Sequence, residues 1–410
     1  MKPTRSLGVL FWVIFACATV GGAGRVDAQE ICVAPPPAPP NAAASVTPAA
    51  TSATPAAVNL SWVPVETTGP AGATSYVIEV GGQPGATNIA TFDTGTTAAS
   101  HLQYAANGTY FVRVRARNEC GLSEPSPEVA VVVSGSVTPG IPAARVVVPS
   151  VTPHRDTLGN EYVTGEVRGV WGARPMAFVR VEGTFTGPTG SPVGTEFSYI
   201  YGRSRRMTVS RAIDDSTMAA GESACFAIYT TIPAASVSAF SLSMSFSTAA
   251  VEALRGNVVV QSALQSADAL GDLKMSGEQT NVGTSITYFN EVFFAVRDAQ
   301  ERVIDCDFTY VTGSPIELPS GVTTDTALAP GQTGSFVNFN GVPRSLVSRV
   351  IAWSGWEESE SGTMASGMRA PSWRRLVSGR DAELALSPRA RARARNAAIE
   401  RLRAATNTLQ

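Results

Sequence analysis

Lysine and histidine are nearly absent from this sequence. The 410 residues contain lysine only at Lys2 and Lys274 and histidine only at His101 and His154. Charged residues make up 16% of the chain, well below the ~25% of an average protein. Two histidines in separate regions cannot form a histidine cluster for zinc. The formal net charge of −2 gives no overall field that would draw the chain to nucleic acid.

The sequence also lacks the short motifs of common active sites. It has no Gly-x-Ser-x-Gly elbow, no Ser-x-x-Lys motif and no phosphate-binding glycine loop after a strand. Asp305 and Asp307 alternate along one predicted strand, but no loop of spaced aspartates accompanies them, as a calcium site would require. We therefore predict that the chain is not an enzyme and that it has no cofactor and no metal site.

The first 28 residues have the order of a secretory signal peptide. A positive start at Lys2 and Arg5 precedes the apolar run 7–20, and Val26-Asp27-Ala28 places compact residues before a cleavage point. Two alternatives stay open: an uncleaved anchor helix, and lipidation of Cys17 within a loose bacterial lipobox. We expect a secreted, periplasmic or cell-surface protein with no transmembrane span after signal cleavage.

Alternation of apolar residues predicts β-strands from residue 58 onward. Val58, Leu60 and Trp62 recur at period two, and residues 76–80 and 111–116 repeat the pattern between Gly- and Pro-rich turns. This spacing is typical of a β-sandwich.

Two of these strands resemble those of a fibronectin type III domain. Leu60-Ser61-Trp62 is similar to the second strand of that family, and the residues 109–118 are similar to its sixth strand. The resemblance covers residues 36–135, although the spacing from Leu102 to Tyr110 is longer than the usual corner before the sixth strand. Bacterial members of the family act as spacers or binding modules, so the resemblance implies no single function.

Residues 155–360 contain an internal repeat. Glu196–Gly202 reappears as Asp307–Gly313, and Ala220-Gly221-Glu222 reappears as Pro330-Gly331-Gln332. The aromatic strand followed by a Pro-Gly turn resembles FxLYD-type immunoglobulin-like domains of exported bacterial proteins. We interpret the aromatic rows mainly as core packing.

The tryptophans of the second repeat are candidates for a surface contact. Trp353 and Trp356 are three residues apart, so on a strand they face opposite ways. One of them could therefore be exposed and contact a sugar or a protein partner.

Five cysteines are present, and the fibronectin type III resemblance implies one pairing. In that fold the N-terminus and the loop of Cys120 lie at the same pole, which allows a Cys32–Cys120 disulfide in an oxidising compartment. Cys225 and Cys306 occupy different positions of the two repeats, so either a bridge between the repeats or two buried thiols is possible.

The C-terminal segment is rich in arginine and poor in apolar residues. Arg389, Arg391 and Arg393 alternate with alanine after Pro388, which could begin a helix. Because Ile399 and Leu402 would make only a poor apolar stripe, we expect a solvated, partly helical tail. The alternative is a basic segment that binds anionic lipid, acidic polysaccharide or nucleic acid.

The sequence as a whole predicts an all-β protein of tandem immunoglobulin-like and fibronectin type III β-sandwiches with a basic, possibly helical C-terminal tail. The predicted parts are a signal peptide (1–28), a Pro/Ala-rich lead-in (29–57, able to supply a first strand from residue 36), a fibronectin type III-like domain (58–135), a linker (136–152), two immunoglobulin-like repeats (153–250 and 262–360) and a low-complexity Arg-rich tail (361–410).

The predicted function is that of a non-catalytic binding or scaffold protein, secreted or at the cell envelope, acting as a rigid rod of sandwiches. Its partner would be a protein or polysaccharide of the envelope and not a specific nucleic acid. Cys32, Cys120, Trp353, Trp356, Arg389, Arg391 and Arg393 are the residues singled out for disulfide or surface contact. A carbohydrate-binding accessory protein is the alternative, and an enzyme with a carboxylate pair is the weakest candidate.

Overall fold

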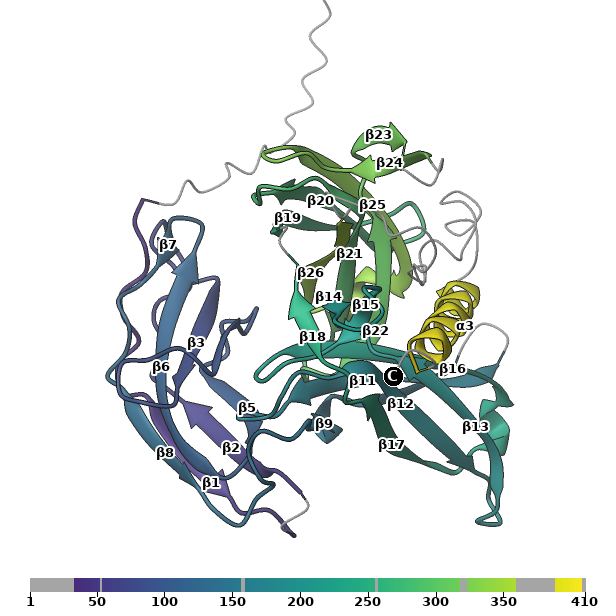
Figure 1. Cartoon of the computed structure of the whole chain (residues 1–410), viewed down its shortest axis with the longest axis horizontal. Coiled ribbons are helices and arrows are strands. Elements are labelled where there is room, and N and C mark those ends of the chain that lie inside the picture. Colours follow the sequence, from purple (N-terminus) through teal and green to yellow (C-terminus); the bar gives the residue numbers. More distant parts are fainter. Residues whose placement is uncertain are drawn as a thin grey trace, which may run out of the picture.

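The computed structural model describes residues 33–51, 54–155, 159–254, 257–317, 323–358 and 388–407. The predicted signal peptide, Cys17, Cys32 and most of the Arg-rich tail lie outside these residues. The described chain is built of antiparallel β-sheets and one long α-helix (Figure 1). Among the described residues, no helix combines the length and the apolar character that a membrane span needs.

The first sandwich has the strand order of a fibronectin type III domain. One sheet has the order β1-β2-β5, and the other has the order β4-β3-β6-β7, with β8 paired to β6. The strands are β1 (Ala43–Thr47), β2 (Ala56–Ser61), β3 (Ser75–Gly81), β4 (Ala90–Asp93), β5 (Ser100–Ala105), β6 (Gly108–Asn118), β7 (Gly121–Leu122) and β8 (Val129–Val133). Trp62 packs edge-on against Tyr76 in the core, at 5.0 Å between ring centroids. The Tyr110 hydroxyl donates to the Ala106 carbonyl at 2.9 Å and closes the corner before β6.

The first repeat forms a second sandwich. Its sheets have the orders β10-β11-β16, with β9 on β11, and β13-β12-β17, and the short sheet β15-β14-β18 lies beside them. The strands are β9 (Ala144–Val146), β10 (Thr152–Arg155), β11 (Asn160–Gly169), β12 (Ala177–Thr186), β13 (Pro192–Tyr199), β14 (Arg203–Met207), β15 (Ile213–Thr217), β16 (Ser223–Pro233), β17 (Ala239–Ser247) and β18 (Val251–Ala253), with the 3-10 turns η1 (Val148–Ser150) and η2 (Ala234–Ser236).

The second repeat copies this arrangement. Its sheets have the orders β19-β20-β25 and β22-β21-β26, with the short pair β23-β24. The elements are β19 (Val258–Ala267), β20 (Asp272–Asn281), β21 (Thr287–Arg297), β22 (Val303–Tyr310), β23 (Ser314–Glu317), β24 (Thr323–Ala327), β25 (Thr333–Pro343), η3 (Arg344–Leu346) and β26 (Arg349–Glu358). Even an unusual backbone feature recurs: Phe178 and Phe289 have φ of 50° and 48°, each at a bulge at the start of the equivalent strands β12 and β21.

The two repeats pack face to face and not end to end, so the expectation of a rod was wrong for this part of the chain. Sheet β10-β11-β16 of the first repeat lies on sheet β22-β21-β26 of the second, which makes a stack of four sheets (Figure 1). The central strands are buried on both sides. In β21, Phe294 faces the core of its own sandwich, whereas Phe293 faces the core between the repeats. Burial of both faces explains the uninterrupted apolar run 292–296.

A disulfide crosses the interface between the repeats. Cys225 of β16 and Cys306 of β22 are bonded, with their Cα atoms 5.8 Å apart. The sequence left this pairing open, because a bridge and two buried thiols fitted equally well. The bond joins residues that are 81 positions apart and so restricts the unfolded chain strongly.

The C-terminal helix α3 (Pro388–Asn407) closes one side of the core between the repeats (Figure 1). Ala398, Ile399 and Leu402 pack into that core, and Arg395 is completely buried beneath them. The Arg395 guanidinium lies 2.9 Å from Asp215, donates to the carbonyls of Tyr199 and Ile200, and stacks over Tyr201 at 4.1 Å. The expectation of a solvated tail is therefore wrong for residues 388–407.

Trp171 attaches the first sandwich to the first repeat. Its side chain is fully buried in the core of the first sandwich. Its backbone N–H donates to the Tyr104 carbonyl, and its carbonyl accepts from the Ala106 N–H. Arg168 also donates to the Leu102 carbonyl across this contact. The first sandwich and the two repeats consequently form one body.

We expect loss of the Cys225–Cys306 bond to destabilise the protein. Replacing both residues, Cys225→Ser with Cys306→Ser, should lower the free energy of unfolding by about 2–4 kcal/mol, because the unfolded chain regains the entropy that the bond removes. Urea unfolding followed by tryptophan fluorescence measures this. A variant whose midpoint matches that of the wild type would show that packing alone holds the repeats together.

The docking of α3 should depend on one arginine. Arg395→Met should cost about 3–5 kcal/mol, because it removes the cation from a fully buried ion pair with Asp215. Arg393→Met is the matched control, since the Arg393 side chain is 47% exposed. Urea unfolding and limited proteolysis of both variants test this. Equal effects of the two changes would contradict the buried pair.

Candidate ligand-binding cleft

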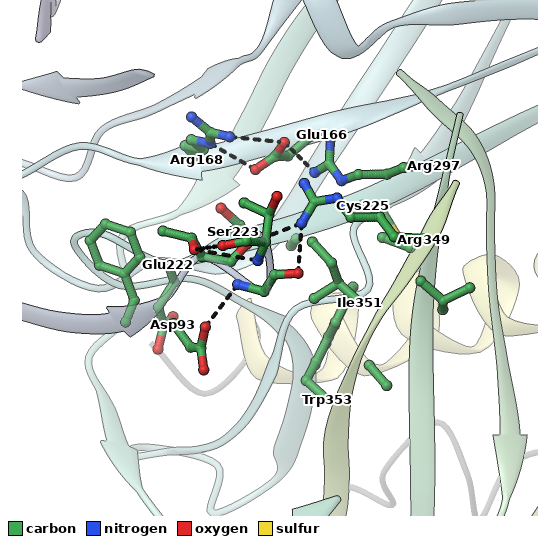
Figure 2. Close-up of a pocket in the computed structure, with 18 of the residues that line it drawn as sticks. Asp93, Glu166, Arg168, Glu222, Ser223, Cys225, Arg297, Arg349, Ile351 and Trp353 are labelled. Carbon is green, nitrogen blue, oxygen red and sulfur yellow. Dashed lines mark hydrogen bonds and ion pairs between the residues drawn. The ribbon is translucent and has the colours of Figure 1, made fainter. Parts of the chain in front are cut away.

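A cleft of about 800 Å³ lies where the first sandwich meets both repeats (Figure 2). The first sandwich contributes β4, β5 and the loop between them. The first repeat contributes β11, β14 and β16, and the second contributes β19, β21 and β26. Because each wall comes from a different unit, the cleft exists only in the assembled chain.

The walls of the cleft are held together by ion pairs. Glu166 of the first repeat lies between Arg168, at 2.7 Å, and Arg297 of the second repeat, at 2.6 Å (Figure 2). Burial opposes a charge on Glu166, but the two guanidinium groups outweigh it and hold the pKa of this carboxyl well below its ordinary range. Arg349 pairs with Glu301 and donates to the Gly95 carbonyl of the first sandwich at 2.8 Å.

Every carboxylate that lines the cleft has an arginine partner among the described residues. The pairs are Asp93 with Arg117 (2.8 Å), Glu166 with Arg168 (2.7 Å), Glu222 with Arg205 (2.5 Å) and Glu301 with Arg349. These acids are therefore already neutralised by the protein itself.

Arg203 differs from the other arginines of the cleft. Within the described parts of the chain, its guanidinium donates no hydrogen bond and makes no ion pair, and its NH1 nitrogen is buried without an acceptor. It lies over the ring of Trp353 at 5.2 Å. Burial lowers its pKa, while the charge of Glu222 opposes that effect. A buried cation without a hydrogen-bonded counter-ion is costly, so the site favours an added anion.

A neutral imidazole lies in the same wall. His101 is partly buried, and burial followed by the charge of Arg168 lowers its pKa well below 6.5. Its ring packs 5.1 Å from Phe92, and its Nε2 atom has no partner within the described structure. His154 lies elsewhere, stacked on Tyr162 at 4.6 Å, and burial lowers its pKa to about 4. The two histidines therefore do not come together.

The predicted surface residues of the second repeat are not exposed platforms. Trp353 is only 8% exposed, and its indole N–H donates to the Gly202 carbonyl of the first repeat at 2.9 Å. Trp356 packs against the core of its own sandwich. Alternation does place the two rings on opposite sides, but both sides are covered, so the surface assignment of Trp353 was wrong.

The three predicted arginines of the tail differ in their burial. Arg391 is buried and pairs with Asp307 at 2.6 Å, which overturns its assignment to the surface. Arg389 is partly buried, and only Arg393 is exposed, 3.9 Å from Glu196. Asp307 and Glu196 are equivalent residues of the two repeats, so α3 contacts the same position twice.

Cys120 is disulfide-bonded. Its predicted partner, Cys32, lies outside the described residues. The pairing of these two residues therefore stays a prediction.

Sequence reasoning missed Arg203, Arg297 and Arg349, which come from strands far apart in the chain. One signal was present: Arg203, Arg205 and Arg206 fall within a single strand, which is unusual in a chain with so little charge. No group of three His, Cys, Asp or Glu side chains that could hold a metal ion occurs in the described ranges.

A second buried polar cluster lies beside α3. Asp305 accepts a hydrogen bond from Asn340 at 2.5 Å, and Asp307 pairs with Arg391. Burial, and then the charge of Asp307, raises the pKa of Asp305 from 3.8 to about 7.

Comparison with known proteins gives a fold likeness only. No family model matches the sequence, and no curated protein matches it. Among solved structures, the FN1–FN3 domains of chicken CNTN1 are 11% identical with a TM-score of 0.19, covering 52% of this chain and 68% of that one. Chitinase ChiA74 from Bacillus thuringiensis is 14% identical with a TM-score of 0.16, covering 48% of this chain and 28% of that one. Such weak likenesses carry no argument about function.

The buried Asp305 should make stability depend on pH in a defined direction. Between about pH 4 and pH 7 the folded state keeps a proton on Asp305 that the unfolded state has released, so its contribution to stability falls as the pH rises. The free energy of unfolding of Asp305→Asn, minus that of the wild type, should therefore increase over this window by up to about 1.4 kcal/mol per pH unit and level off above it. Urea unfolding at several pH values measures the difference. A difference that is constant with pH would refute the assignment.

Proposed function

We propose that this chain is a non-catalytic binding protein, secreted or held at the cell envelope, whose three sandwiches form a rigid frame around a cleft for an anionic ligand. The single observation that carries the proposal is Arg203, the one arginine of the cleft wall that has no ion pair or hydrogen bond within the described residues. The fibronectin type III-like fold is compatible with a binding or scaffold role. We also propose that the two repeats are FxLYD-like immunoglobulin-like domains.

The proposed ligand class is an acidic sugar. A guanidinium binds a carboxylate through two parallel hydrogen bonds, and Arg203 has its donors available. The cleft wall adds hydroxyl groups from threonine and serine, such as Thr91, Thr96 and Ser100, which can bond sugar hydroxyls. Phe92 adds an apolar ring. A neutral carbohydrate is the second candidate, because these groups need no charge on the ligand.

We propose that the protein is not catalytic because of the ion pairing and the pKa of the carboxyl groups in the cleft. A glycosidase needs one carboxyl group with a raised pKa and a second that is free to act as base or nucleophile. Glu166 has a lowered pKa, and the other three carboxylates of the cleft are ion-paired. None of them suits the role of general acid.

A location outside the cytoplasm is proposed from two features. The segment 1–28 has the order of a secretory signal, and the Cys225–Cys306 disulfide fits an oxidising compartment. Soluble export and retention at the cell surface are both compatible with these features. Fractionation of cells that express the full chain would distinguish them.

Arg203→Gln should weaken binding of an acidic oligosaccharide at least tenfold, because a hydrogen bond to a charged group contributes about 1.5–3 kcal/mol. Oligogalacturonate is the probe, and titration calorimetry with the mature chain is the measurement. Arg211→Gln is the matched control, since Arg211 is a partly exposed arginine paired with Glu252 and does not line the cleft.

The panel also includes a neutral cello-oligosaccharide and inorganic phosphate. Binding of the neutral sugar that is unaffected by Arg203→Gln would favour the second candidate. Binding of phosphate alone would keep the anion site but reject the sugar. Failure of all three ligands to bind the wild type would overturn the proposed function.

A further inference from the structure

The internal repeat reveals one sheet face that is covered in the first repeat and open in the second. In the first repeat, the outer face of sheet β10-β11-β16 is covered by the second repeat. The equivalent sheet of the second repeat, β19-β20-β25, forms the far end of the four-sheet stack (Figure 1). No described element covers the outer face of that sheet. We call this outer face, with Leu264, Lys274, Ser276, Glu278, Val337 and Phe339, the terminal face.

The terminal face keeps the apolar residues of a covered face. Ala227, which is 1% exposed in the interface between the repeats, corresponds to Val337, which is 47% exposed. Tyr229, which is partly buried, corresponds to Phe339, which is 59% exposed. Leu264 on the neighbouring edge of the sheet is 66% exposed. Three large apolar side chains thus share one open surface, the kind of patch that marks an interaction site.

The polar residues of the covered face recur as well. Glu166, which pairs with Arg297 across the interface, corresponds to Glu278. Thr164, whose hydroxyl donates to the Val303 carbonyl of the second repeat, corresponds to Ser276. Glu278 is exposed, and no ion pair is found for it in the described ranges. The face therefore has the acid, the hydroxyl and the aromatic group of a sheet-to-sheet contact, but no described element packs on it.

The charged residues of the terminal face are complementary to those of a second copy of the same face. Lys274, Ser276 and Glu278 alternate along the middle strand β20, so their side chains point to the same side. Leu264 and Val337 lie directly on either side of Ser276 in the strand register. A twofold axis that lies between the two faces, at right angles to β20 and level with Ser276, would place Lys274 of one copy opposite Glu278 of the other, twice, with the apolar residues packed between them.

We propose that two copies of this chain pair through their terminal faces. A head-to-tail chain of copies does not fit, because the outer face at the other end of the stack is partly covered by α3, whose Glu400 pairs with Arg180 at 3.0 Å. That face also carries Glu182 and Thr184 where the second repeat has Phe293 and Ala295, so it lacks two of the apolar side chains that the interface between the repeats uses. The terminal face is complementary to its own copy, so the assembly closes as a dimer.

The first test is the oligomeric state of the mature full chain by sedimentation velocity over a range of concentrations. The wild type should sediment as a dimer, and Val337→Asp should shift it to monomer. Val193→Asp is the matched control, since Val193 is 43% exposed on the first repeat and lies outside the terminal face. A wild type that remains monomeric at about 100 µM, or a dimer that Val337→Asp leaves intact, would overturn the proposal.

Charge exchange tests the orientation of the two copies. Lys274→Glu and Glu278→Lys should each weaken the dimer at least tenfold, because each places like charges opposite one another, and the double variant should recover it. Monomers from all three variants would contradict the twofold arrangement. This comparison does not depend on the cleft ligand, since the terminal face contains no arginine of the cleft.

Crosslinking gives an independent readout because Lys274 and Lys2 are the only lysines of the sequence. A carbodiimide should join Lys274 to Glu278 of the other copy. In a mixture of isotope-labelled and unlabelled chains, mass spectrometry should find crosslinked peptides that carry both forms. A Lys274 crosslink found only within single chains would refute the pairing.

Discussion

The face-to-face packing of the two repeats determines the arrangement of the rest of the molecule. It brings Phe293 and Trp353 into a shared core, places Cys225 within bonding distance of Cys306, and buries Glu166 against Arg297. The same packing brings β14 beside β26 and so forms two walls of the cleft. Apolar burial supplies most of the stabilisation, while the buried ion pair and the disulfide fix the register of the two sheets.

More of the fold than of the site could be predicted from the sequence. Period-two alternation located the strands around Trp62, and the repeated segments around Phe197 and Phe308 located the paired sandwiches, because both are local patterns. The packing of one repeat on the other was missed. Its signal was the unbroken apolar run 292–296, which shows that both faces are buried but not which surface covers the second.

A helix that begins at Pro388 was predicted and is confirmed, but its docking into the core was missed for a different reason. Its buried side is a regular stripe through Arg391, Arg395, Ile399 and Leu402, but two positions of the stripe are arginine. Hydrophobic periodicity counts arginine as solvent-facing, although Asp307 and Asp215 provide buried partners for both side chains. Those partners lie in other sandwiches, so no local pattern could reveal them. The cleft was missed for the same reason, because its walls come from three units and lie together only after these units assemble.

Helix α3 also sets an order of events for folding. The core between the repeats is lined by residues from 177 to 353, yet Ala398, Ile399 and Leu402 are needed to close it. Tyr199, Tyr201 and Asp215 at the edge of that core contact Arg395 of the helix, so their packing is completed only when the helix docks. Each sandwich can form as its own strands emerge, whereas the contact between them is completed by a segment that follows both in the chain. Assembly of the full body is therefore a late step, after synthesis of residues 388–407.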